Sequence, residues 1–254
     1  MTFIELSMLF AVAAAAGAIN AVAGGGSFIS FPALVLAGVP PISANATNTT
    51  ALWPGSAASV GAYRRELAHQ RNEIFLFSGL SLTGGLLGAL LLLRTREAVF
   101  AQLIPYLLLL ATLVFAASPW LTRMARQLGA DGGGWFRRAG ILTLYLGIAV
   151  YGGFFGAGLG ILTLAALALL GQENIHEMNA LKTLQATLVN GVAVMAFVLA
   201  GVVQWPVALV MTAGAILGGY GGAAVARRID PRLVRYAVLA FSLALTVYFF
   251  MRTA

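Results

Sequence analysis

The sequence has no cysteine, one lysine and two histidines among its 254 residues. The missing cysteines exclude disulfides, a thiolate nucleophile and cysteine-ligated zinc. The two histidines are far apart, so no metal-ligand pattern is present. Neither glycine-rich stretch is a nucleotide-binding loop, because 24–26 lacks a following Lys-Ser/Thr pair and 158–160 lacks a third glycine. No catalytic triad or usefully spaced pair of carboxylates is recognisable either, so we expect no metal, no cofactor and no enzymatic activity.

Charge is also scarce. Only 9% of the residues are charged and 60% are hydrophobic, whereas about 25% of the residues in a soluble domain are charged. Several apolar runs approach the ~20 residues that a helix needs to cross a hydrocarbon core. The net charge of +7 comes from arginine clusters between these runs, as in cytoplasmic loops of membrane proteins, so nucleic acid is not an expected partner. The composition predicts an all-α, polytopic transmembrane helical bundle in a lipid bilayer.

We predict about ten apolar segments, at 3–23, 27–38, 45–63, 74–93, 99–118, 139–155, 159–170, 179–201, 206–226 and 233–251. The first is expected to be a retained helix, because no lysine or arginine precedes it as in a cleaved signal. The second and seventh segments have only 12 residues each, roughly 18 Å of helix, which is too short to cross the membrane alone. A glycine-rich break precedes each of them. Whether these two segments cross or are re-entrant is left open.

The segments fall into two related halves. A polar linker at 119–138 separates a first repeat, 1–118, from a second, 139–254, and the order of segment types is the same in both. Asn45 and Thr49 match Asn179 and Thr183 at an offset of 134 residues. If all ten segments cross, eleven arginines lie on one face and three on the other, so the linker is predicted to be cytoplasmic and both termini outside. Five crossings per half make the repeats inverted, a recurrent plan of secondary transporters.

Polar residues follow each short segment. Lys182 stands between apolar runs, and a charge at membrane depth is a functional-site hypothesis by default. Asn179 and Thr183 share its helix face, and Gln185 adds an amide. The glycine breaks would offer free N–H groups and the positive end of a helix dipole to an anion. Together these groups suit a small oxyanion. The predicted substrate-binding residues are Gly25, Gly26, Ser27, Asn45, Thr47, Asn48, Thr49, Gly158, Asn179, Lys182 and Thr183.

Structural explanations exist for the same residues. Asn45 and Asn179 could simply cap helices, and Lys182 could extend to the cytoplasmic surface. The glycines of the two breaks could serve only to bring helices into close contact. Close packing is the role that we expect for Gly84, Gly88, Gly218 and Gly222.

These motifs resemble a known family. The run from Gly24 to Phe28, with Pro32 and Gly38 after it and then Ala44-Asn45-Ala46-Thr47-Asn48-Thr49, resembles the sulfite exporter TauE/SafE family, also called the toluene-sulfonate uptake permease family. Stretches 152–160 and 179–182 are similar to its second repeat, and the resemblance covers about residues 5–250. It implies a multi-pass transporter in the bacterial cytoplasmic (inner) membrane for sulfite, sulfonates or related organic anions. It also implies that the polar motifs hold the substrate. Lys182 departs from the commoner pattern, which leaves the substrate open.

We therefore expect a secondary transporter that moves a small anion by alternating access, with proton coupling. His176 and Glu177 are the candidates for coupling, because they are titratable and lie beside the second cluster. The alternative is that they form, together with Glu173, a solvated polar turn. An uncoupled anion channel is the alternative function. The direction of transport, the coupling ion and the oligomeric state are left open, and a homodimer is among the possibilities.

Overall fold

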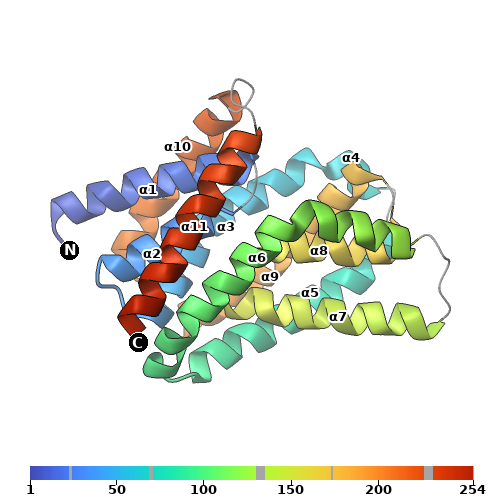
Figure 1. Ribbon diagram of the computed structural model, residues 1–254, viewed down its shortest axis with the longest axis horizontal. Coiled ribbons are helices and arrows are strands. Elements are labelled where there is room, and N and C mark those ends of the chain that lie inside the picture. Colours follow the sequence, from blue (N-terminus) through green and yellow to red (C-terminus); the bar gives the residue numbers. More distant parts are fainter. Residues whose placement is uncertain (23–24, 69–70, 130–134, 173, 226–230, 254) are drawn as a thin grey trace. The chain divides into compact units, whose positions relative to one another are not determined.

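The computed structural model describes residues 1–22, 25–68, 71–129, 135–172, 174–225 and 231–253 (Figure 1). Within these ranges it contains eleven α-helices and no strand, which confirms the all-helical prediction. The helices are α1 (Phe3–Val22), α2 (Ser27–Leu36), α3 (Pro41–Ala62), α4 (Arg64–Ala68), α5 (Arg71–Arg94), α6 (Glu97–Gly129), α7 (Trp135–Phe154), α8 (Leu159–Leu169), α9 (Ile175–Leu199), α10 (Trp205–Val225) and α11 (Pro231–Thr253). Five of them, α1, α5, α6, α9 and α11, are long and apolar enough to cross a membrane.

Some helix bounds differ from the predicted segments. Residues 64–68, in the arginine-rich stretch between the third and fourth predicted segments, form the short helix α4. Helix α6 has 33 residues and continues through Pro119 to Gly129, into the predicted linker. Residues 120–128 contain no glycine or proline, so nothing in their backbone preferences stops the helix there. The glycine run at 132–134 lies outside the described residues.

The two short helices match the predicted segments closely. Helix α2 has 10 residues and α8 has 11. Each ends in a glycine with positive φ, Gly38 at +82° and Gly171 at +84°. The next residue donates its N–H back to the carbonyl five positions earlier, from Val39 to Leu34 at 3.1 Å and from Gln172 to Leu167 at 3.2 Å. This is the Schellman ending, in which glycine adopts the left-handed conformation without a Cβ penalty.

The chain forms two compact units. Unit 1 contains residues 1–55, 92–113 and 197–254, and unit 2 contains residues 56–91 and 114–196. Each unit draws on both predicted halves of the sequence. Helices α3, α5, α6 and α9 each contribute residues to both units.

Unit 1 is built around a close crossing of α1 and α10. A Cβ at Gly218 would overlap the carbonyl oxygen of Ala14, and one at Gly17 would overlap the carbonyl oxygen of Ala215. Glycine therefore lets the two backbones touch, as small residues do at helix contacts in membranes. Gly214 adds a third such approach, to the carbonyl oxygen of Phe10.

Unit 2 is built around an equivalent crossing of α5 and α7. A Cβ at Gly88 would overlap the carbonyl oxygen of Val150, and one at Gly153 would overlap the carbonyl oxygen of Gly85. Beside this crossing, the hydroxyls of Ser81 and Tyr145 lie 2.6 Å apart in a buried hydrogen bond. The packing role that we predicted is confirmed for Gly84, Gly88 and Gly218, whereas the side-chain surroundings of Gly222 lie outside the description.

The two crossings exchange partners between the predicted halves. In unit 1 the glycine-rich helix α10 of the second half packs on α1 of the first half. In unit 2 the glycine-rich helix α5 of the first half packs on α7 of the second half. Each unit thus contains one broken-helix pair from one half and one glycine-rich helix from the other.

Candidate functional site

The first glycine break lies in unit 1 between α1 and α2. Gly25 has a φ of +103°, which turns the chain. A Cβ at Gly26 would overlap the carbonyl oxygen of Ala16, so this glycine permits close contact with α1. The amide oxygen of Asn20 accepts the Gly26 N–H at 2.7 Å. The side chain of Asn20 therefore already satisfies a backbone donor that we expected to face a ligand.

The second glycine break lies in unit 2 between α7 and α8. Gly156 and Gly158 have φ values of +83° and +78°. The Tyr151 hydroxyl donates to the Ala157 carbonyl at 2.7 Å and fixes the turn. Among the described residues, the N–H groups of Gly158 and Gly160 have no acceptor. The positive end of the α8 dipole is thus left with unsatisfied donors.

Lys182 lies directly beside this open end of α8. A Cβ at Gly160 would be 3.4 Å from Lys182 Cδ, so the lysine side chain passes over the first turn of α8. Lys182 Nζ donates to Asn179 Oδ1 at 3.0 Å. In the part of the chain that the structure describes, no carboxylate forms an ion pair with Nζ. A positive helix end and an ammonium group therefore lie together with only a neutral amide as partner.

Gln185 adds unsatisfied polar atoms one turn further along α9. Its side chain is 1% exposed, and neither Oε1 nor Nε2 has a hydrogen-bond partner among the described residues. On α8, the buried hydroxyl of Thr163 also has no partner among them. A buried polar group without a partner costs about 1–3 kcal/mol. From the sequence we expected Gln185 only as an additional amide and did not predict Thr163, whose signal is a polar residue within an apolar short helix.

The first polar cluster lies in unit 1, on α3. Asn45, Thr47 and Asn48 are all buried. Thr47 Oγ1 accepts the N–H of Gln204 at 3.0 Å, at the start of α10. Asn48 is 3% exposed, and its Oδ1 has no partner in the described part of the chain. One of the four predicted binding groups on α3 is thus already bonded to a backbone donor within its own unit.

The two clusters share one local pattern. The Thr49 hydroxyl donates to the Asn45 carbonyl at 2.8 Å, and the Thr183 hydroxyl donates to the Asn179 carbonyl at 2.8 Å. Both threonine protons therefore remain within the helix, and only the oxygen lone pairs are left for other donors.

Helix capping does not explain Asn45 or Asn179. Helix α3 begins at Pro41 and α9 begins at Ile175, so each asparagine is the fifth residue of its helix. Proline suits the first helical position because its missing N–H needs no acceptor. At the start of α3, the Glu97 carboxylate accepts the N–H of Ile42 at 2.8 Å.

The start of α9 has its own cap. Asn174 Oδ1 accepts the N–H of His176 at 3.0 Å, and Asn174 Nδ2 donates to the Glu177 carboxylate at 3.0 Å. The side chain of His176 is exposed. Gln172 donates to the Glu73 carboxylate, which ties this turn to α5. Glu177 thus takes part in the cap of α9. The role of His176 and Glu177 in proton coupling stays a prediction. Glu173 lies outside the described residues.

The predicted binding residues fall into two sets. One set lies in unit 1 and contains Gly25, Gly26, Ser27, Asn45, Thr47, Asn48 and Thr49. The other lies in unit 2 and contains Gly158, Asn179, Lys182 and Thr183, and the two candidates for proton coupling, His176 and Glu177, lie in the same unit. Within unit 2 the structure brings Lys182 onto the turn that follows Gly158. That the two sets face one shared site stays a prediction.

Comparison with known proteins gives one consistent family. Residues 9–249 match the family described as sulfite exporter TauE/SafE. A probable membrane transporter protein of Haemophilus influenzae is 32% identical over 248 residues, covering 95% of this chain and 92% of the relative. The probable membrane transporter protein YfcA of Escherichia coli K12 is 31% identical, covering 93% of this chain and 86% of the relative. A third relative, the probable membrane transporter protein ORF9 of a Sinorhizobium species, is 29% identical over 97% of this chain and 93% of the relative. No solved structure is significantly similar to the chain.

Proposed function

We propose that this chain, which belongs to the sulfite exporter TauE/SafE family of membrane transporters, is a secondary transporter of a small oxyanion in a bacterial cytoplasmic membrane. Sulfite and small sulfonates are the substrates that fit the family description best. The chain moves its substrate by alternating access and is not an enzyme. In this proposal the linker faces the cytoplasm and both termini lie outside.

The observation that carries the proposal is the position of Lys182. Its side chain crosses the first turn of α8, where the N–H groups of Gly158 and Gly160 lack acceptors among the described residues. A bound oxyanion would compensate the ammonium charge and accept these N–H bonds at the same time. The unsatisfied amide of Gln185, three residues after Lys182, would supply further donors.

The repeated design supports alternating access as the transport mechanism. Two short helices with the same ending and two polar clusters at matching positions fit an inverted-repeat carrier, whose halves move around a central site. His176 and Glu177 stand at the start of α9, in the same unit as Lys182, and would link transport to protons. An uncoupled anion channel is the alternative, because the same charged turn could line a passive pore.

The test is uptake of labelled sulfite and of a small sulfonate panel into liposomes that contain the purified protein. Uptake is measured with and without an imposed proton gradient and with unlabelled anion inside. We expect the gradient and the internal anion to accelerate uptake, and Lys182→Met to abolish it. Lys182→Arg, which keeps the charge, should retain part of the activity. Arg252→Met is the control for loss of a single cation.

Three outcomes would count against the proposal. If folded wild-type protein took up none of the tested oxyanions, small oxyanions would be excluded as its substrate class. Uptake that follows the electrochemical gradient passively, without acceleration by internal anion, would favour the channel. Unchanged uptake and affinity in Lys182→Met would show that the lysine has no part in binding.

A further inference from the structure

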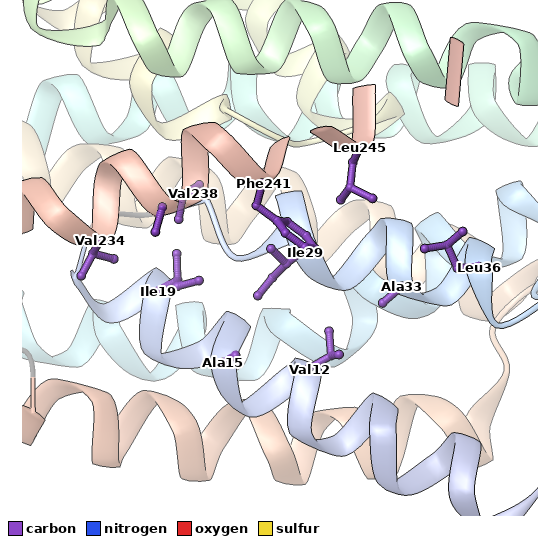
Figure 2. Close-up of a pocket in the computed structure, with 11 residues that line it drawn as sticks. Val12, Ala15, Ile19, Ile29, Ala33, Leu36, Val234, Val238, Phe241 and Leu245 are labelled. Atoms are coloured by element: carbon purple, nitrogen blue, oxygen red, sulfur yellow. The ribbon is translucent and has the colours of Figure 1, made fainter. Parts of the chain in front are cut away.

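Unit 1 contains an apolar groove that the transport proposal does not use. It lies between α1, α2 and α11 and encloses about 480 Å³. This is within the range of about 300–1,000 Å³ that small-molecule sites occupy. Figure 2 shows Ile29 and Phe241 extending into the space from α2 and α11, above Ala15 and Val12 of α1. The groove is partly open, and all of its lining residues are apolar.

The groove persists because its walls cannot close on it. Helix α1 is held on its other side by backbone contact with α10, through Gly218 and Gly17. Small side chains at Ala15, Ala33 and Ala237 leave the volume between the helices unfilled. If α1 moved to fill the groove, it would lose its backbone contact with α10. The groove can therefore be filled only by a group from outside the unit.

A lipid acyl chain is the occupant that fits this lining. Two walls, α1 and α11, are long and apolar enough to cross a membrane, so the groove lies at the depth of lipid tails. Phe241 is 47% exposed and Leu36 is 46% exposed, which shows that the groove continues onto the outer face of the unit. A polar solute would find no hydrogen-bonding side chain there.

The charges of α11 select the kind of lipid. The lining stripe on α11 begins at Val234, directly before Arg235, and ends at Leu245. From Leu245 to Arg252 is seven residues, roughly 10 Å of helix, so a cation adjoins only one end of the stripe on α11. Basic residues at a membrane surface attract anionic headgroups. We propose that the groove binds one acyl chain of an anionic phospholipid whose phosphate lies at Arg235.

A fluorescence experiment tests this on the full-length protein. Phe241→Trp places a reporter in the groove, and Leu243→Trp places one on the same helix outside the lining, where the leucine is also 47% exposed. Each variant is reconstituted in phosphatidylcholine with a small fraction of phosphatidylglycerol that has brominated acyl chains, which quench tryptophan. The parent protein supplies the background from its four native tryptophans.

We expect the emission of the Phe241→Trp reporter to be quenched as though the anionic lipid were enriched about fivefold over its bulk fraction, the effect of one basic residue near the surface. Leu243→Trp should follow the bulk fraction. Adding Arg235→Gln should remove the enrichment, whereas adding Arg252→Gln should leave it. Adding Ala33→Trp overfills the groove, so native mass spectrometry of this variant should show loss of one retained lipid.

Several results would overturn the proposal. Equal quenching of both reporters would mean that the groove holds no lipid of its own. If brominated phosphatidylcholine were enriched to the same degree, Arg235 would have no role in selecting an anionic lipid. If Ala33→Trp turned a dimer into a monomer without loss of lipid, a second copy of the chain would be the occupant. Because none of these residues belongs to the proposed anion site, transport can fail or survive independently of the result.

Discussion

In the first broken-helix copy, formed by α1, α2 and α3, nearby groups already bond several of the polar atoms that a ligand would need. Asn20 accepts the N–H of Gly26, and Thr47 accepts the N–H of Gln204. The Glu97 carboxylate accepts an N–H at the start of α3. The second copy, formed by α7, α8 and α9, differs at the equivalent place. Its break leaves the N–H groups of Gly158 and Gly160 without acceptors among the described residues.

The charge distribution follows the same division. Lys182 occupies the position that Asn48 occupies in the first copy, at the offset of 134 residues. The two copies keep nearly the same short-helix length and the same Schellman ending, but they differ at the residue before the short helix, where Gly26 has a φ of −57° and Gly158 has a φ of +78°. The lysine charge thus belongs to the second copy alone, while in the first copy the N–H of Gly26 and the hydroxyl oxygen of Thr47 are already bonded within the unit.

The largest expected effect is on folding, and here the two glycine crossings, α1 with α10 and α5 with α7, should behave alike. Gly218→Val and Gly88→Val each place a side chain against a backbone carbonyl of the crossing helix. We expect each to destabilise the folded protein by about 3 kcal/mol or more. Thermal unfolding and size-exclusion profiles in detergent measure this. Gly221→Val and Gly79→Val, where a Cβ meets nothing within 4 Å, are the matched controls. A large loss of stability at only one crossing would show that the two crossings are not equivalent.

The next effect should separate the copies. Lys182→Asn gives the second cluster the residue of the first and removes the charge beside α8. A hydrogen bond to a charged group contributes about 1.5–3 kcal/mol, so we expect anion affinity to fall about tenfold to a hundredfold. Isothermal titration with sulfite measures it. Asn48→Ala should weaken binding less, and a larger loss from Asn48→Ala would reverse the assignment of the two copies.

At Gln185 we expect a smaller effect, in which a substitution lowers anion affinity without lowering stability. Gln185→Leu removes a buried amide whose atoms have no partner among the described residues. We expect thermal stability to stay equal or rise, because the unsatisfied group is no longer buried. Anion affinity should fall about threefold to tenfold, the contribution of one neutral hydrogen bond. A variant that loses stability without losing affinity would assign Gln185 to packing alone.

The smallest expected effect concerns the closed break. Asn20→Ala removes the acceptor of the Gly26 N–H, which should cost about 1 kcal/mol of stability. Anion affinity should stay within about twofold of the wild-type value, because this break belongs to the copy that we assign no ligand charge. Chemical unfolding and the same titration measure the two quantities. A tenfold change in affinity would show that the first break does contact the substrate.

Local features of the fold were predictable from sequence. The two short helices stand out in the sequence because a glycine-rich break precedes each 12-residue apolar segment. The packing glycines of α5 and α10 were predictable from their spacing. The continuation of α6 to Gly129 was not, because a proline at 119 and nearby arginines suggest a loop when the neighbours of the segment are unknown.

The bonding of the polar residues could not be predicted in the same way. Thr47 and Gln204 are 157 residues apart, and no local pattern pairs them. Gly26 and Gly158 look equivalent in sequence, yet only Gly26 has an asparagine placed to accept its N–H. The contact of Lys182 with the first turn of α8 and the missing partners of Gln185 depend on tertiary packing, which residue spacing does not encode.

Because each unit takes its glycine-rich helix from the other predicted half, the two units can be completed only at different stages of synthesis. Unit 2 needs no residue beyond 196, so its helices can all meet while the ribosome is still adding the end of the chain. Unit 1 needs α10 and α11, which leave the ribosome about two hundred residues after α1. Helix α1 is made first, but its close contact with α10 through Gly17 and Gly218 cannot form until α10 has been synthesised. The first helix to be synthesised is therefore among the last to complete its packing.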